Sequence, residues 1–232
     1  MLSVHGFGSS AELTWQVTGH VRALVGAGCR VIAPDLPGHG GSHKPHEPSA
    51  YSLDGLVADL AAVADGLGGG QISLLGYSLG ARLSVALVAA EAQRLGAPVR
   101  RLVVGGYDDR RLFRGVDAGR LTRILRDPAA IAEADPETAR IAGIALGAPG
   151  NDLDALAAMV SGLPPTEHAT VAPAIPTMVV AGTADPLASG AEQWAATLPH
   201  ADFLPIPGRD HISTVTAGLF RRRAAEFLAA AQ

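Results

Sequence analysis

The chain has 232 residues, 48% of them hydrophobic and 17% charged, a balance typical of a globular protein with a sizeable buried core. Eighteen basic and 22 acidic residues give a net charge of −4, which argues against a surface for nucleic acid or anionic membrane. The single cysteine, Cys29, rules out an internal disulfide, and no apolar run is long enough to span a membrane. Because the N-terminus also lacks a signal-peptide pattern, we expect a cytoplasmic protein that binds neither nucleic acid nor membrane.

Short apolar runs alternate with longer helical stretches over most of the chain. The runs that read as buried strands are residues 2–4, 30–33, 72–75, 102–104, 177–181 and 202–206. The stretches that read as helices are residues 13–27, 53–67, 79–95, 188–198 and 212–231. This order predicts a single α/β domain over residues 1–232, built on a doubly wound, mostly parallel sheet.

Residues 107–172 interrupt the alternation. They hold helical patches at 112–125, 137–146 and 153–163 and five prolines, which predict short helices. We interpret the segment as a helical lid inserted between the two parts of the core, residues 1–106 and 173–232. Loops and lids at the carboxyl edge of such a sheet are where α/β folds bind their ligands.

The pentapeptide Gly76-Tyr77-Ser78-Leu79-Gly80 matches the G-x-S-x-G pattern of a nucleophile elbow. It follows a predicted strand and precedes a predicted helix, the context that the elbow requires. The glycines let strand and helix approach closely, and the helix N-terminus directs free N–H groups at the serine oxygen. Ser78 is therefore the predicted nucleophile.

A serine hydroxyl needs a base, and the base needs an acid that orients it. His211 lies after the last predicted strand and before the last helix, and Asp185 follows the strand at 177–181. This gives the chain order serine, acid, histidine. The competing acids are Asp108 and Asp109, which follow the strand at 102–104.

The segment His5-Gly6-Phe7-Gly8 follows the first strand, and its glycines let the backbone turn an N–H inward. We expect the backbone N–H groups of Phe7 and Leu79 to form an oxyanion hole. Gly6, Tyr77 and Arg111 are the predicted substrate-binding residues.

These pieces, in this order and over nearly the whole chain, resemble the α/β-hydrolase superfamily. Further hallmarks are the loop Asp35-Leu36-Pro37-Gly38-His39-Gly40-Gly41-Ser42 and Trp15. Gly105-Gly106, the short lid and Pro207-Gly208-Arg209-Asp210-His211 are similar to a group of small bacterial serine hydrolases. The resemblance implies a small-molecule substrate, no metal and no organic cofactor.

The function that we favour is hydrolysis of a carboxylic ester or related acyl bond through an acyl-enzyme. The alternative is a lyase that uses the same three residues for proton abstraction, as in menaquinone-pathway synthases or in natural-product elimination and cyclisation. Such a lyase would hold an anionic substrate with Arg110, Arg111 or Arg114. A non-catalytic ligand receptor is the third possibility, since receptors of this fold often keep the triad.

The sequence departs from the family pattern in its first strands and in the length of its lid. Members usually have two strands before the one at residues 2–4, and without them the strand at 30–33 would be an exposed edge. Either the true start lies upstream, or a partner chain covers the edge, as in a homodimer. The short lid predicts a shallow, partly open site for a small to medium acyl group.

Overall fold

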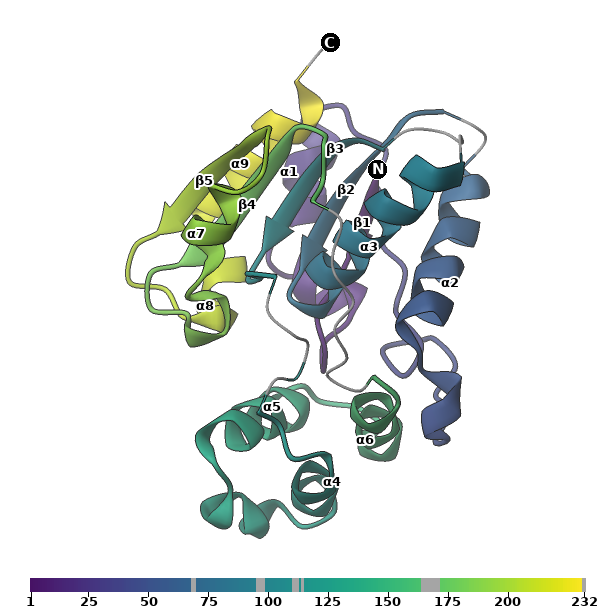
Figure 1. The fold of residues 1–232 in the computed structure, drawn as a ribbon, viewed down its shortest axis with the longest axis vertical. Coiled ribbons are helices and arrows are strands. Elements are labelled where there is room, and N and C mark those ends of the chain that lie inside the picture. The colour runs from purple at the N-terminus through teal and green to yellow at the C-terminus, as the bar shows by residue number, and fades with distance from the viewer. Residues whose placement is uncertain (68–69, 95–98, 110–112, 114, 164–171, 231–232) are drawn as a thin grey trace.

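We describe a computed structural model of the chain over residues 1–67, 70–94, 99–109, 113, 115–163 and 172–230. A five-stranded parallel sheet forms its centre, with the strands side by side in chain order (Figure 1). The strands are β1 (Leu2–Val4), β2 (Ile72–Tyr77), β3 (Val99–Gly105), β4 (Thr177–Gly182) and β5 (Ala201–Ile206). The five described strands and the helices around them agree with the predicted α/β-hydrolase fold without the two usual first strands.

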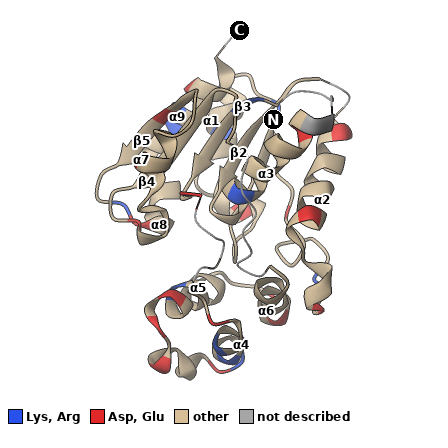
Figure 2. Cartoon of the chain, in the orientation of Figure 1, with Lys and Arg blue, Asp and Glu red and all other residues tan. Residues whose placement is uncertain are grey.

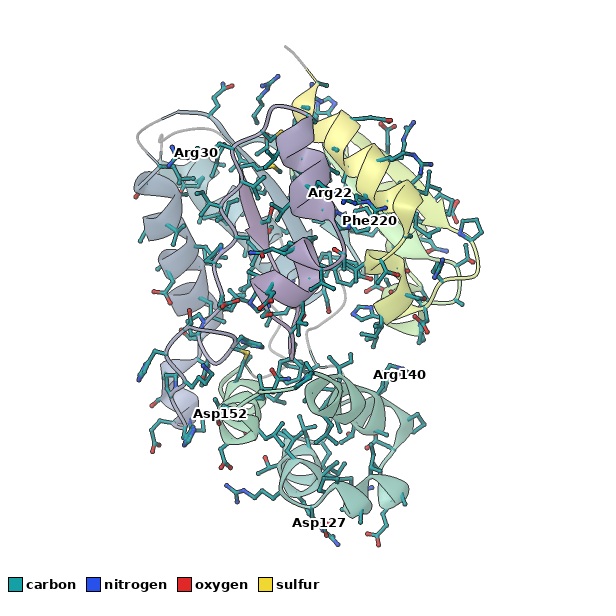
Figure 3. The ribbon with its side chains drawn as sticks, turned by 180° about the vertical axis from the view of Figure 1, so that it is seen from behind. Arg22, Arg30, Asp127, Arg140, Asp152 and Phe220 are labelled. Atoms are coloured by element: carbon teal, nitrogen blue, oxygen red, sulfur yellow. The ribbon has the colours of Figure 1, made fainter. Side chains whose placement is uncertain are left out.

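Helices connect the strands and cover both faces of the sheet. They are α1 (His20–Gly26), α2 (Leu53–Asp65), α3 (Leu79–Arg94), α4 (Ala118–Arg126), α5 (Pro136–Gly147), α6 (Leu153–Gly162), α7 (Ala191–Ala195), α8 (His211–Val215) and α9 (Gly218–Ala229). Seen from the front, α2, α3 and α7 lie over one face (Figure 1), and seen from behind, α1 and α9 lie side by side over the other (Figure 3).

Each face of the sheet has its own hydrophobic core. Leu74, Val104 and Val179 point toward α2, α3 and α7, whereas Leu75, Val103 and Val180 point toward α1 and α9. Neighbouring strand residues are thus buried on opposite faces, which explains why these strands are continuous apolar runs rather than alternating ones. Charged residues lie mainly on the helices and loops around the sheet (Figure 2).

One edge of the sheet differs from the sequence-based prediction, whereas the strand predicted at 202–206 forms the other edge. Residues 30–33 do not form a full strand, because they meet β1 through a single bridge, Leu2 to Ile32. Pro34 follows directly and has no N–H to extend the pairing. At the opposite edge, β5 contains Pro205, which an outer strand tolerates because one side of its backbone is unpaired.

Two predicted helices are interrupted. The stretch at 13–27 divides into a π-helical turn, Glu12–Gln16, and α1, because Gly19 between them adopts φ 81°. The stretch at 212–231 divides into α8 and α9, separated by Ala217 in an extended conformation. No described helix is both long enough and apolar enough to cross a membrane.

The helices α4, α5 and α6 lie together beyond one end of the sheet (Figure 1). Each begins at an aspartate whose side chain accepts a backbone N–H of the first turn: Asp117, Asp135 and Asp152. Gly162 at the end of α6 fits against the carbonyl of Pro48, where a side chain would collide. This segment therefore has its own well-capped helices and is packed against the core.

Candidate active site

Ser78 lies at the sharp turn between β2 and α3. Its φ of 53° is in the left-handed region, which a residue with a side chain seldom occupies. The turn is possible because its neighbours have no side chains: a Cβ on Gly76 would lie 2.4 Å from the Gly80 carbonyl oxygen, and one on Gly80 would lie 2.1 Å from that of Val4. The backbone thus has the geometry of a nucleophile elbow.

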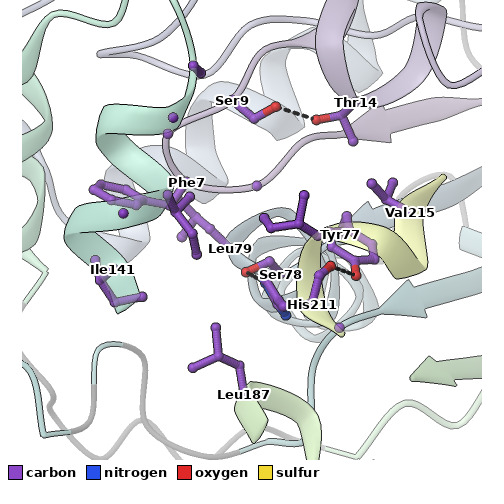
Figure 4. Close-up of a pocket in the computed structure, with 18 of the residues that line it drawn as sticks. Phe7, Ser9, Thr14, Tyr77, Ser78, Leu79, Ile141, Leu187, His211 and Val215 are labelled. Atoms are coloured by element: carbon purple, nitrogen blue, oxygen red, sulfur yellow. Dashed lines mark hydrogen bonds between the residues drawn. The ribbon is translucent and has the colours of Figure 1, made fainter. Parts of the chain in front are cut away.

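The structure joins Ser78, His211 and Asp185 by hydrogen bonds, and Figure 4 shows Ser78 next to His211. Ser78 Oγ lies 3.0 Å from His211 Nε2, and His211 Nδ1 lies 2.9 Å from Asp185 Oδ2. With the Nδ1 proton directed at the carboxylate, Nε2 is free to accept the serine proton. Both His211 and Asp185 are buried, so the hydrogen bond between them is shielded from bulk water, whereas Ser78 is half-buried.

Short helical turns hold the acid and the base in place. Asp185 caps the 3₁₀ turn Pro186–Ala188, and its second oxygen accepts the Leu187 N–H at 2.9 Å. His211 is the first residue of α8, which begins with a capping box between Asp210 and Ser213. Asp210, although it adjoins His211 in sequence, therefore uses its side chain to begin a helix.

Tyr77 contacts both the backbone and the ring of His211. Its hydroxyl donates a 2.5 Å hydrogen bond to the backbone carbonyl of His211, and its ring lies against the imidazole. Burial, and after it the nearby Asp185 carboxylate, holds the pKa of Tyr77 well above its usual value, so the phenol remains a donor. Tyr77 also lines the cavity beside Ser78, but its polar atom is engaged with the protein.

The predicted oxyanion-hole residues lie on either side of Ser78. A Cβ on Gly6 would lie 3.2 Å from Ser78 Cβ, so the loop after β1 passes directly over the serine. Phe7 and Leu79 both line the cavity. Among the described residues, neither the Phe7 nor the Leu79 backbone N–H has a hydrogen-bond acceptor, which leaves both able to donate to a substrate oxygen.

Two buried histidines brace this loop. His5 Nε2 accepts the Leu36 N–H and His39 Nε2 accepts the Gly8 N–H, both at 3.0 Å, while each Nδ1 donates to a carbonyl. Burial lowers the pKa of His5, and burial together with the neighbouring His5 lowers that of His39 to about 3. Both imidazoles are thus neutral near pH 7, as an acceptor nitrogen requires.

Asn151, just before α6, joins the helical segment to the same loop. Its side-chain amide donates to the carbonyl oxygens of Gly8, at 2.9 Å, and Ala145, at 2.8 Å. Sequence reasoning missed Asn151, because a lone asparagine in a turn carries no pattern that links it to a residue 143 positions away.

The competing acids have other partners. Asp108 Oδ2 accepts the Gly190 N–H at 3.0 Å, and Asp109 Oδ1 accepts the Tyr107 hydroxyl at 3.0 Å and lies 3.8 Å from Arg82. The geometry thus supports Asp185 as the residue that orients His211. Arg111, with Arg110 and Arg114, lies outside the described residues.

A cavity of about 710 Å³ opens beside Ser78 and His211. The side chains around it are mainly apolar, and they come from the loop after β1, α5, α8 and the turn after β4. Figure 4 shows Ser78 and His211 between Phe7 and Ile141 on one side and Val215 on the other. Among the described residues, no group of three or more His, Cys, Asp or Glu is placed to hold a metal ion.

The model of the alpha/beta hydrolase family matches residues 1–230, so the chain belongs to that family. The Epoxide hydrolase A of Mycobacterium tuberculosis is 36% identical over 81 residues, which are 35% of this chain and 24% of that protein. The 2-hydroxy-6-oxo-2,4-heptadienoate hydrolase of Pseudomonas putida is 37% identical over 103 residues, 44% of this chain and 35% of that protein. The chain spans about a quarter of the length of the epoxide hydrolases it matches.

Solved structures share the fold over almost the whole chain. The enol-lactonase of Burkholderia xenovorans covers 99% of this chain and 91% of its own, with 21% identity and a TM-score of 0.72. The bromoperoxidase of Bacillus anthracis covers 99% and 91%, with 19% identity and a TM-score of 0.71. At these identities the likeness concerns the fold alone.

Proposed function

We propose that the chain is a serine hydrolase that cleaves a carboxylic ester or related acyl bond of a small molecule through an acyl-enzyme. The observation that carries this proposal is the hydrogen-bonded chain from Ser78 through His211 to Asp185, set beside a mainly apolar cavity. It joins a nucleophile, a base and an orienting acid, the parts that acyl transfer to serine needs.

In this mechanism Ser78 Oγ attacks the acyl carbon while His211 Nε2 takes the serine proton. The carbonyl oxygen becomes an oxyanion, which the N–H groups of Phe7 and Leu79 stabilise. The tetrahedral species collapses, the bond to the leaving alcohol breaks, and His211 returns the proton to that alcohol. Water then attacks the acyl-enzyme with His211 as base, which releases the carboxylic acid and regenerates Ser78.

Epoxide hydrolysis, the activity named for several relatives, fits a serine nucleophile less well. An epoxide opened by Ser78 would leave an ether on the enzyme, and water does not readily cleave an ether. An ester formed on Ser78, in contrast, is activated for attack by water. The alternative lyase activity depends on arginines at 110, 111 and 114, and no contact of the described residues favours it over hydrolysis.

The test compares wild type with Ser78→Ala on p-nitrophenyl esters of increasing acyl length. Loss of the nucleophile removes about a million-fold of turnover from an enzyme that works through such a triad. We expect hydrolysis by wild type and none above background by Ser78→Ala, with both proteins folded by circular dichroism. Equal activity in the two proteins, or none in a folded wild type, would contradict the proposal.

A further inference from the structure

Exposed apolar side chains gather at the mouth of the cavity. The large hydrophobic residues that are more than a third exposed are Leu13 (38%), Val17 (71%), Val25 (56%) and Ile212 (58%), counting the described part of the chain. Leu13, Val17 and Ile212 line the same cavity as Ser78, and Val25 does not. Single exposed apolar residues are ordinary, but a group at the rim of a pocket marks a ligand-binding surface.

The rim is built from two short helical turns that lie far apart in sequence. Leu13 and Val17 are four residues apart on the turn that follows the loop over Ser78, so they share a face. Ile212 and Val215 are three residues apart on α8, directly after the base. Each turn buries its other face in the protein, Trp15 in the first and Thr214 in the second.

On the side of the helical segment, the cavity is closed by buried apolar groups. Phe7 and Phe113 meet edge to face with ring centroids 5.2 Å apart, and Ile141 of α5 lines the cavity on the same side as Phe7 (Figure 4). A volume of about 710 Å³ is in the range of pockets that enclose whole organic ligands, roughly 300–1,000 Å³. An acetyl group would fill only a small part of it, so the cavity is larger than the short lid suggested.

The described wall of the cavity carries few charges. Among the described lining residues, the Asp, Glu, Lys and Arg side chains are those of Asp108 and Glu137. Glu137 pairs with Arg140 at 2.9 Å, and Asp108 accepts a backbone N–H. Most of the described lining therefore offers a ligand apolar contacts rather than charges.

We propose that the substrate is a predominantly apolar acyl compound, with a hydrocarbon portion that extends from Ser78 across the rim of Leu13, Val17 and Ile212. The occupant is part of the substrate because the rim is continuous with the cavity that holds the reacting serine. This inference rests on the proposed function for the position of the acyl carbon. The apolar character of the ligand follows from the cavity itself.

The first experiment measures kcat/KM for p-nitrophenyl acetate and decanoate in wild type, in the double variant Leu13→Ser/Val17→Ser and in the control Val25→Ser. Each buried methylene is worth up to about fourfold in affinity, so wild type prefers decanoate. The decanoate-to-acetate ratio falls about tenfold in the double variant, because two apolar contacts are lost. It stays at the wild-type value in Val25→Ser, because Val25 is also exposed but does not line the cavity.

The second experiment measures binding of the neutral ketones butan-2-one and decan-2-one to Ser78→Ala by calorimetry. We expect decan-2-one to bind about 100-fold more tightly or better. A wild type that hydrolyses esters but prefers acetate, with equal binding of the two ketones, would overturn this inference and leave the proposed function in place. Suppose that no ester is hydrolysed, that decan-2-one binds tightly to Ser78→Ala, and that adding Leu13→Ser/Val17→Ser weakens this binding. The inference of an apolar ligand then stands and the proposed reaction fails.

Discussion

The ends of the strands and the helical segment beyond them contribute to the site in different ways. The strand ends provide Ser78, Asp185 and His211, joined by hydrogen bonds and held by helix caps. The helical segment provides apolar side chains that line the cavity, such as Ile141. It is linked to the loop over Ser78 by the hydrogen bond from Asn151 to Gly8. Under the proposed function, the core determines the reaction and the residues around it largely determine the shape of the substrate, which is one reason why a single fold hosts many activities.

The largest effect is expected where the core holds its base. Asp185→Asn keeps the shape of the side chain but loses the carboxylate that selects the Nδ1–H tautomer of His211, so kcat should fall about 10⁴-fold for every ester. Asp108→Asn is the matched control, because Asp108 bonds to Gly190 instead, and it should cost less than about tenfold. Steady-state kinetics decides, and a larger loss in Asp108→Asn would make Asp108 the acid.

A smaller loss in the core is expected from Tyr77→Phe. This change leaves the His211 carbonyl without its hydroxyl donor and lets α8 shift, at a cost of about 1–2 kcal/mol, or roughly tenfold in kcat. KM should stay within about twofold, because no polar atom of the substrate loses a partner. A raised KM with unchanged kcat would instead mean that the hydroxyl binds substrate directly.

The smallest effect is expected at the link between the two regions. Asn151→Ala removes the hydrogen bonds to Gly8 and Ala145 and should lower the free energy of unfolding by about 1–2 kcal/mol. Because Gly8 follows Phe7 in the loop over Ser78, kcat should fall a few-fold. Urea denaturation and kinetics measure the two effects, and unchanged values would mean that the two regions act independently.

The sequence was sufficient for the parts of the site that depend on local geometry. Strand, turn and helix around Ser78 follow from five consecutive residues, and parallel strands bring their carboxyl ends to one edge of the sheet. The positions of Asp185 and His211 after successive strands therefore predicted that they would meet. The distances of 2.9 Å from His211 to Asp185 and 3.0 Å from His211 to Ser78 could not be derived in this way.

The features that sequence reasoning missed depend on contacts between distant residues. Leu13 and Ile212 line one cavity although they are nearly 200 positions apart, and each alone reads as an ordinary apolar residue of a helix. A strand at 30–33 was predicted from the apolar composition of the segment. In the structure the segment pairs with β1 through one bridge, and Pro34 has no N–H to extend this pairing. Tyr77 was predicted to bind substrate. In the structure its hydroxyl donates a hydrogen bond to the backbone carbonyl of His211, and the sequence gives no sign of this contact.

The most direct test of acyl transfer through Ser78 is covalent labelling with a fluorophosphonate, followed by intact mass and peptide mapping. Wild type should gain one adduct, on Ser78, and lose ester hydrolysis in proportion. His211→Ala should remain largely unlabelled, because without its base the serine is a weak nucleophile. Labelling at another residue, or equal labelling of Ser78 in His211→Ala, would contradict a serine activated by His211.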